Sequence, residues 1–422
     1  MTALAPLRLV SFRFLLAGRT INALGNAFAP IALAFAVLDL TGSATDLGLV
    51  VGARTLVNVL FLLFGGVLAD RLPKHVLMVG ASLAAAVTQG MVAALVLTHT
   101  ATIPLLIALG AVNGMVAALA LPASASILPV VVPAEMRQQA NALSRLSLNA
   151  AAIIGAPIAG IVVAMIGPGA GITFDAVTFA VSAFCFLALR AVAPPRAADG
   201  GSSRTKVFAD LRTGWSEFRS RTWLWVVVAG FCVLNAAWSG GMFILGPVVA
   251  DETIGRRAWG LVLAAETAGI IVGGLIAMRL RLRRLLYFGV FCCVFEGLPI
   301  VLLGIHPQLW ALVAGALVAG LALEQFGVAW ETTMQEHVPG DKLARVYSYD
   351  MVGSFLAIPI GQVAIGPIAH AAGLRPTLIG AAALTLLATL GMLASRSVRT
   401  LRHELPPRAP EPAAAGVEQS VA

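Results

Sequence analysis

The chain has 422 residues, of which 59 % are hydrophobic and 11 % are charged, and its formal net charge is +8. Soluble globular proteins have about half apolar and about a quarter charged residues, so this composition excludes a water-soluble domain. The basic balance alone would also suit a nucleic-acid-binding protein, but the positions of the basic residues argue for another cause.

Twelve apolar runs follow one another along the chain. They centre near residues 26, 57, 86, 114, 152, 179, 236, 269, 295, 320, 357 and 386. A membrane-spanning helix needs about 20 apolar residues, and none of the runs shows the alternation of a barrel strand. The first run, residues 14–38, is too long for a signal peptide and is kept as a span. The sequence therefore predicts an all-α integral membrane protein with 12 transmembrane helices.

The basic residues alternate from loop to loop. If both termini are cytoplasmic, the cytoplasmic segments hold Arg8, Arg13, Arg71, Lys74, Arg137, the seven basic residues within 190–221, those of 279–284, Lys342, Arg345 and those of 396–408. The external loops hold only Arg256, Arg257 and Arg375. This asymmetry follows the positive-inside rule and predicts a multi-pass protein of the cell inner (cytoplasmic) membrane, with no nucleic-acid partner.

The chain divides into two similar halves. Residues 1–190 are predicted to form an N-terminal six-helix bundle, 191–221 a cytoplasmic linker, 222–397 a C-terminal six-helix bundle and 398–422 a disordered cytoplasmic tail. Residues 65–72 are echoed by 273–280, and residues 132–135 by 338–341. One unit is thus used twice, as in transporters whose site lies between two parallel halves near the middle of the membrane.

Four stretches resemble a known family: residues 39–44 (DLTGSA), 66–74 (GVLADRLPK), 174–179 (FDAVTF) and 330–339 (WETTMQEHVP). With them, residues 8–397 resemble the major facilitator superfamily, in the drug:proton antiporter branch of the macrolide and tetracycline effluxers and the enterobactin exporter. Pro73 stands where a glycine is usual. The resemblance implies two pseudo-symmetric six-helix bundles, and a latch on the inward side formed by Gly66, Asp70, Arg71 and Lys74; the alternative is a solvated turn with routine charges. Met278 occupies the position that matches Asp70, so the latch is expected on one half alone.

The fifth span contains GAPIAG at residues 155–160, which resembles the antiporter signature through Gly155, Pro157 and Gly160. It departs from that signature at Ala156 and Ile161. Small residues let helices approach closely and a proline loosens the backbone, so the stretch suits a seal or pivot, or ordinary close packing.

Ionisable groups at membrane depth are costly and mark functional candidates. Proton coupling needs a carboxyl group whose proton affinity changes with burial and access to water. Glu324 is the first candidate, because it should lie near mid-depth on a helix that lines the cavity; Glu266, Glu296 and Asp175 follow.

In the family plan, the first, fourth, seventh and tenth spans line the central cavity. The polar and adaptable residues on these spans are Arg19, Asn22, Asn26, Asn113, Asn235, Trp238, Met242, Trp330 and Glu331. A polar stripe on an apolar helix must face protein or water. These residues are predicted to line the substrate cavity, and the alternative for each is a buried polar contact that only joins helices.

No pattern for catalysis is present. The three lysines follow Pro73, Thr205 and Asp341, whereas an ATPase phosphate loop needs a lysine after glycine. The four cysteines lie in apolar runs without metal-type spacing to histidine, so neither a metal nor a cofactor is expected.

The sequence thus predicts a monomeric secondary transporter and not an enzyme. Its partners are the lipid bilayer, a small-molecule substrate and protons, and its function is efflux of a drug-like, antibiotic or siderophore-like amphiphilic compound. The alternatives are a proton-coupled importer of a small nutrient and a non-transporting membrane receptor or assembly protein of the same fold.

Overall fold

The computed structural model describes residues 4–71, 74–190, 215–280 and 282–403, and within them it contains helices and no strand. Twelve of these helical segments are long and apolar enough to cross a membrane. Each of the twelve predicted centres falls inside one of them, so the predicted fold class is confirmed. Long apolar runs without strand-like alternation are sufficient to produce this result, since a helix satisfies all its backbone hydrogen bonds internally.

Glycine and proline lie at several ends of the first six spans. Their elements are η1 (Ala5–Arg8), α1 (Val10–Thr41), α2 (Ala44–Arg71), α3 (Lys74–Leu97), α4 (Ile103–Val131), η2 (Ala134–Met136), α5 (Arg137–Met165) and α6 (Pro168–Arg190). Gly42 ends α1 in the left-handed region at φ 64°, a conformation that favours glycine. Pro168 then opens α6, at a position where a helix does not need the missing N–H group.

The second six spans are less regular. Their elements are α8 (Thr222–Trp238), η3 (Ser239–Leu245), α9 (Gly246–Glu252), α10 (Arg256–Ala277), α11 (Leu285–Cys292), η4 (Cys293–Gly297), α12 (Leu298–Ile305), α13 (Leu309–His337), α14 (Gly340–Phe355), α15 (Ile358–Ala372), α16 (Leu374–Ala394) and α17 (Arg396–Thr400). The seventh span contains a π-helical turn, η3, and the ninth a 3-10 turn, η4. Pro247 and Pro299 are the second residues of the helices that follow these turns, and their missing N–H groups interrupt the α-helical ladder.

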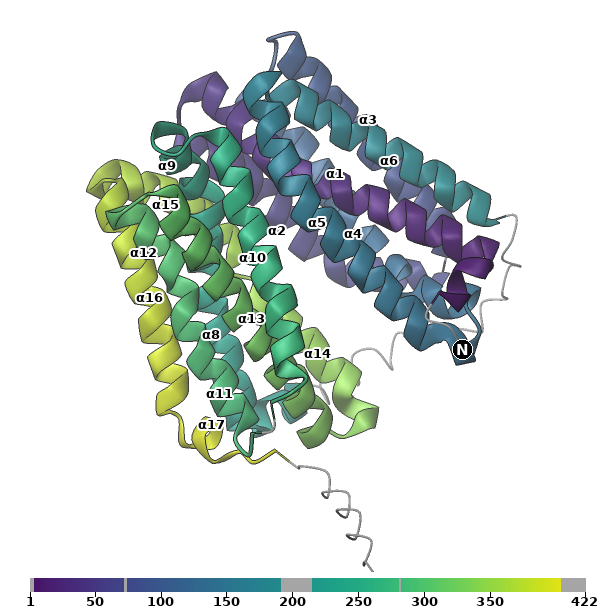
Figure 1. Ribbon diagram of the computed structural model, residues 1–422, viewed down its shortest axis with the longest axis vertical. Helices are drawn as coiled ribbons and strands as arrows, with labels where there is room; N and C mark the ends of the chain where they lie inside the picture. Colours follow the sequence, from purple (N-terminus) through teal and green to yellow (C-terminus); the bar gives the residue numbers. More distant parts are fainter. Residues whose placement is uncertain (1–3, 72–73, 191–214, 281, 404–422) are drawn as a thin grey trace, which may run out of the picture.

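The two sets of six spans form two bundles that approach each other at one end only (Figure 1). We call the face where α1 begins and α17 ends the terminal face, and the opposite face the far face. The helices of the first bundle, coloured purple to blue, diverge from those of the second toward the terminal face (Figure 1). The contacts between the bundles therefore determine which face is closed.

The first contact between the bundles is the crossing of α5 with α10. A Cβ atom at Gly160 of α5 would lie 2.8 Å from the carbonyl oxygen of Arg256, at the start of α10. A Cβ at Gly260 would collide with the carbonyl oxygen of Ala156. These obstacles are backbone atoms that cannot rotate away, so glycine is required on both helices.

The second contact is the crossing of α2 with α15, and it has the same character. A Cβ at Gly48 would collide with the carbonyl oxygen of Gln362, and one at Gly366 would lie 2.6 Å from the Cα of Thr45. We call these two crossings together the seam. Because α2 and α10 begin at the far face and α5 and α15 end there, the seam closes the far face.

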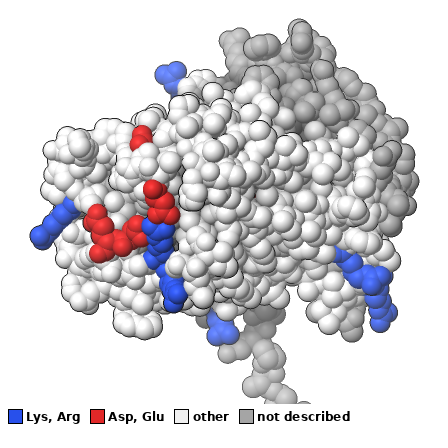
Figure 2. All heavy atoms as spheres, turned by 90° about the horizontal axis from the view of Figure 1, so that it is seen from above, with Lys and Arg blue, Asp and Glu red and all other residues white. Residues whose placement is uncertain are grey.

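An ion pair on the far face spans the two bundles. The Nη1 and Nη2 atoms of Arg256 donate to both carboxylate oxygens of Asp39 at 2.9 and 2.5 Å, and the same guanidinium binds Asp251. Charged side chains are sparse on this face, with acidic and basic groups meeting near one point (Figure 2). Since the Asp39 side chain is 41 % exposed, the pair contributes only about 0–1 kcal/mol, and backbone packing dominates the seam.

The apolar core also joins the two bundles near the far face and not near the terminal face. The largest cluster of buried side chains joins both bundles, with Phe35 and Leu47 of the first against Trp259 and Ile365 of the second. Two smaller clusters belong to single bundles and contain residues from the helix ends at the terminal face. The structure is therefore closed at the far face, while the bundles are packed separately near the terminal face.

The start of the second bundle is fixed at the terminal face. Glu217 accepts hydrogen bonds from Lys342 at 2.9 Å and from Arg221 at 2.6 Å. These two cations hold the pKa of the Glu217 carboxyl below its usual value. Residues 191–214, which include most of the predicted linker, and residues 404–422 of the predicted tail lie outside the described residues.

We predict that Gly260→Leu prevents closure of the far face, because the new side chain has no space against the backbone of Ala156. A cysteine introduced at Thr45, in the other crossing, should then react several-fold faster with a membrane-impermeant maleimide. Gly380→Leu is the matched control, since a Cβ there meets no atom within 4 Å. Equal labelling of the two variants would show that the crossing of α5 with α10 does not hold the seam.

Candidate functional site

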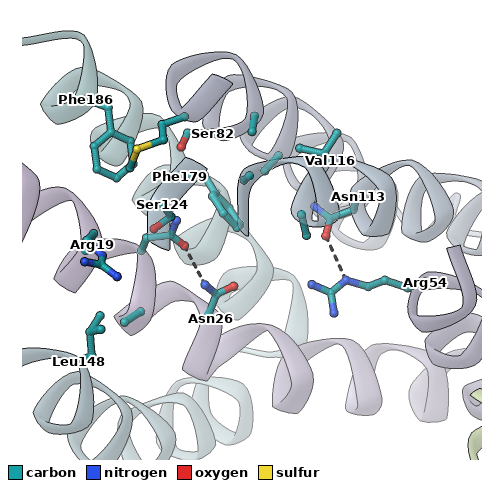
Figure 3. Close-up of a pocket in the computed structure, with 17 residues that line it drawn as sticks. Arg19, Asn26, Arg54, Ser82, Asn113, Val116, Ser124, Leu148, Phe179 and Phe186 are labelled. Carbon is teal, nitrogen blue, oxygen red and sulfur yellow. Dashed lines mark hydrogen bonds between the residues drawn. The ribbon is translucent and has the colours of Figure 1, made fainter. Parts of the chain in front are cut away.

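A cavity of about 320 Å³ lies within the N-terminal bundle (Figure 3). Its walls come mainly from α1, α3, α4 and α6, with one residue each from α2 and α5. The lining residues are Arg19, Asn22, Ala23, Asn26, Arg54, Met78, Ala81, Ser82, Ala85, Asn113, Val116, Ala117, Ala120, Ser124, Leu148, Phe179 and Phe186. The volume and the mostly apolar lining are typical of a site for a small organic molecule.

The polar face of α1 points into this cavity (Figure 3). Arg19, Asn22 and Asn26 recur at helical spacing, and all three line it. The amide of Asn26 donates to the amide oxygen of Asn22 at 2.8 Å. The predicted stripe is thus brought together, and Asn113 of α4 joins it across the cavity.

A second polar group crosses the inner wall of the cavity. Arg54 of α2 donates from Nε to the Oδ1 of Asn113 at 3.0 Å, and Asn113 donates in turn to the hydroxyl of Thr88 on α3 at 3.2 Å. These two hydrogen bonds connect α2, α4 and α3. In bilayer lipid the same polar side chains would have no hydrogen-bond partner.

Asp175 of α6 lies behind this wall and is fully buried. Its Oδ2 accepts a hydrogen bond from Gln89 at 2.7 Å, and its charge interacts with that of Arg54. Gly25 makes the site possible, because a Cβ there would collide with the hydroxyl of Thr178, one turn after Asp175. Asp175 is therefore the counter-charge of Arg54 and does not line the cavity.

The cavity candidates of the second bundle lie in other surroundings. The indole of Trp330 donates to Asp350 at 3.0 Å and the amide of Asn235 to the carbonyl of Ser354 at 3.0 Å. Met242 is buried in the core that joins the bundles. Trp238 packs against that same core, and Glu331 is exposed; none of the five lines the cavity described above.

Two acidic residues of the second bundle interact, of which Glu266 is partly buried and Glu296 is buried. Glu266 lies on α10, Glu296 on the 3-10 turn η4, and their carboxyl groups interact electrostatically. Glu296 is 6 % exposed, and its Oε1 has no hydrogen-bond partner among the described residues. No described arginine or lysine contributes to the electrostatic surroundings of either group. We refer to Glu266 and Glu296 as the acid pair.

Glu324 has different surroundings from the acid pair. It is partly buried on α13 and packs against Gly273 and Gly274 of α10. Its charge interacts with that of Arg145, an exposed residue of α5 in the other bundle, and with that of Glu331. It is thus the candidate carboxyl group that faces a cation across the two bundles.

The antiporter-like stretch of α5 lies in the seam. Gly160 meets the backbone of Arg256, and the Cα of Pro157 limits the space at Gly260. Gly155 faces α1, where a Cβ would lie 2.7 Å from the Cβ of Ala27. The three residues therefore mediate close contacts of α5 with two other helices.

The predicted latch lies at the terminal face, where α2 ends at Arg71 and α3 begins at Lys74. The side chains of Gly66, Asp70, Arg71 and Lys74 lie outside the described part of the structure. Met278, at the matching position of the second half, is 77 % exposed.

The sequence profile of the Major Facilitator Superfamily matches residues 15–356. The chain belongs to this superfamily. The match begins within the first span and ends within the eleventh, and it agrees with the two bundles of six helices described above.

Two curated relatives are uncharacterized MFS-type transporters. YvqJ of Bacillus subtilis is 22 % identical over 64 % of this chain and 64 % of its own length, and y4rN of Sinorhizobium fredii is 24 % identical over 58 % and 60 %. The chain thus spans less than two thirds of the length of either relative.

Solved structures share the fold at low identity. A bacterial homologue of the human lysosomal transporter Spinster, inward-facing and unoccupied, has a TM-score of 0.72 at 14 % identity and covers 94 % of this chain and 98 % of its own. The nucleoside transporter NupG has a TM-score of 0.69 at 14 % identity, covering 91 % and 98 %. A bacterial homologue of the iron transporter ferroportin has 0.69 at 15 %, covering 90 % and 97 %.

The sequence did not reveal the apolar wall of the cavity or the partner of Arg54. Met78, Phe179 and Phe186 look like lipid-facing residues in an apolar helix, and no local pattern separates them from such residues. Asp175 was recognised as an ionisable group at membrane depth, which is the available signal. Its electrostatic interaction with Arg54 needed the structure, because α2 and α6 are far apart in the sequence.

We predict that Arg54 and Asp175 are energetically coupled. Arg54→Met or Asp175→Asn alone should lower the stability of the purified protein, since each removes one of two opposite charges that interact within the first bundle. The double variant should be destabilised by less than the sum, with a coupling of about 0.5–3 kcal/mol. Thermal unfolding in detergent measures this, with the exposed Arg13→Met as control. Additive losses would refute the coupling.

Proposed function

We propose that this transporter is a proton-coupled exporter of an amphiphilic compound, drug-like, antibiotic or siderophore-like, as in the drug:proton antiporter branch that its motifs resemble. The protein would lie in the cytoplasmic membrane as a monomer with both termini in the cytoplasm. The terminal face is then the cytoplasmic face, and the structure corresponds to a state closed to the outside.

The observation that carries this proposal is the position of α10. Near its start, Gly260 packs against the antiporter-like stretch of α5 in the seam. Six residues later the same helix bears Glu266 of the acid pair, and at that level its backbone is in close contact with Gly320 of α13. A proton bound at the acid pair therefore acts on the helix that closes the far face.

Coupling follows from the cost of charge at membrane depth. Two carboxyl groups without a described cation can hold a proton in one conformation and release it in another, once water or a positive charge reaches them. Proton entry would accompany opening of the far face and release of cargo, and proton loss to the cytoplasm would accompany return. Glu324, which interacts with Arg145 of the other bundle, would respond to closure of the terminal face.

The latch and the cavity complete the proposed cycle. Asp70 and Arg71, with Gly66 and Lys74, would hold the terminal face shut when the far face is open, as the resemblance implies. The cavity of the first bundle would hold the cargo, with Arg19, Asn22, Asn26 and Asn113 as its polar contacts.

Import of a nutrient is the competing direction, and some transporters that share the fold, such as the D-xylose-proton symporter, are named for it. Energised inside-out vesicles separate the two. An exporter accumulates its cargo in such vesicles when their interior is acidic, whereas a symporter accumulates it only in right-side-out vesicles. A panel of drug-like compounds tested on cells that express the chain supplies the cargo for this assay.

We predict that Glu266→Gln and Glu296→Gln each reduce proton-driven export at least about tenfold, because glutamine cannot take up the coupling proton. Exchange of labelled for unlabelled cargo without a gradient should persist, since the cavity is unchanged. Glu252→Gln, at an exposed position of the same bundle, is the control. Full proton-driven export by both acid-pair variants would move the coupling site elsewhere, with Glu324→Gln as the next variant to test.

A further inference from the structure

The cavity of the N-terminal bundle contains more positive charges than there are negative charges near it among the described residues. Among the described residues, its lining includes two arginines, Arg19 and Arg54, and no carboxylate. Asp175 behind the wall supplies one negative charge, which interacts with Arg54. The cavity thus keeps a net positive charge whether Asp175 is ionised or protonated.

Arg19 is the unbalanced residue. Its guanidinium is partly buried and has no hydrogen-bond or ion-pair partner among the described residues. Arg54 differs, since it donates to Asn113 and interacts electrostatically with Asp175. Buried charges in proteins are paired, and an arginine within a transmembrane bundle is costly unless a partner satisfies it. The arrangement of Arg19 is therefore incomplete without an anion.

The surroundings of Arg19 indicate which kind of chemical group is attached to that anion in the ligand. A Cβ at Gly18 would lie 2.6 Å from the Phe186 ring, so α1 packs directly on the aromatic wall beside Arg19. Phe179 extends this wall in the cavity (Figure 3), and Met78 also lines the cavity. An apolar body of modest size has space here, while the amides of Asn22 and Asn26 are available on the Arg19 side.

We propose that the cavity binds an amphiphilic oxyanion, a carboxylate or phosphate ester with one negative charge and an apolar body. The anionic group pairs with the Arg19 guanidinium, whose planar array of donors matches two oxyanion oxygens. The apolar body lies against Met78, Phe179 and Phe186. This inference rests on the proposed function in taking the cavity as the cargo site, and it restricts the amphiphilic cargo to anions.

The test is equilibrium binding to the purified chain in phosphatidylcholine nanodiscs, with 2-naphthoate as probe and 2-naphthamide and 2-naphthylmethylammonium as matched neutral and cationic compounds. We expect naphthoate to bind at least about tenfold more tightly than either. Arg19→Gln should weaken naphthoate binding about 10- to 100-fold and leave naphthamide unchanged, since the lost contact is a hydrogen bond between charged groups. Arg19→Lys should retain part of the preference, and the exposed Arg13→Gln all of it.

Protein stability supplies a readout without ligand. Because Arg19 carries an unpaired charge, Arg19→Gln without probe should be at least as stable to heat as the parent. Adding naphthoate should raise the unfolding temperature of the parent and not that of the variant. Equal binding of the anionic, neutral and cationic probes would overturn the proposal. So would a preference for naphthoate that is unchanged in Arg19→Gln.

Two further experiments extend this test. One distinguishes a lipid headgroup from a free solute as the source of the oxyanion, and the other separates the anion site from the proposed function. If phosphatidylglycerol in the nanodisc competes with naphthoate through Arg19, the natural oxyanion is a lipid headgroup; unchanged binding indicates a free solute. Charge-selective binding without proton-driven export would contradict the proposed function alone. Export of a cargo with no dependence on its charge or on Arg19 would contradict the anion site alone.

Discussion

Close backbone contact at glycine is the constraint on which the rest of the structure depends. In the two crossings of the seam, Gly160 and Gly260 on one side and Gly48 and Gly366 on the other meet backbone atoms of the opposite bundle. Helices that pack this closely gain dispersion contacts over their whole crossing, which is the main attraction available between helices in lipid. The crossing cannot adapt gradually to a larger side chain, because interlocking backbones either fit or separate. The seam is for that reason suited to two discrete states, closed and open.

The membrane-embedded charges that the proposed function uses for cargo and for protons lie in different bundles. The first bundle contains the arginines of the cavity, Arg19 and Arg54, and the second contains the acid pair, Glu266 and Glu296. The proposed function assigns cargo to the positive side and protons to the negative side. The seam lies between them, and α10 belongs both to the seam and to the acid pair. Proton binding and cargo access are then linked through one helix, without direct contact between proton and cargo.

The sequence was sufficient for the fold, because each span is specified locally by a run of apolar residues long enough to cross the bilayer. It also identified the polar face of α1, since Arg19, Asn22 and Asn26 follow helical spacing and line one cavity. It did not reveal hydrogen-bond partners that come from distant spans. Trp330 bonds to Asp350 and Asn235 to the Ser354 carbonyl within their own bundle, and their place in the substrate cavity stays a prediction. The breaks at η3 and η4 were also missed, although Gly240, Gly241 and Pro247 signalled the first of them.

The central claim is that the seam is one of two alternating closures, and interspin distances test it most directly. Spin labels at exposed Thr98 and Arg375 report on the far face, and labels at exposed Arg13 and Arg399 on the terminal face. On acidification with cargo present, a second population should appear in which the far-face distance is longer and the terminal-face distance shorter. Distances that lengthen together on both faces, or a terminal-face distance that never shortens, would contradict alternating closure.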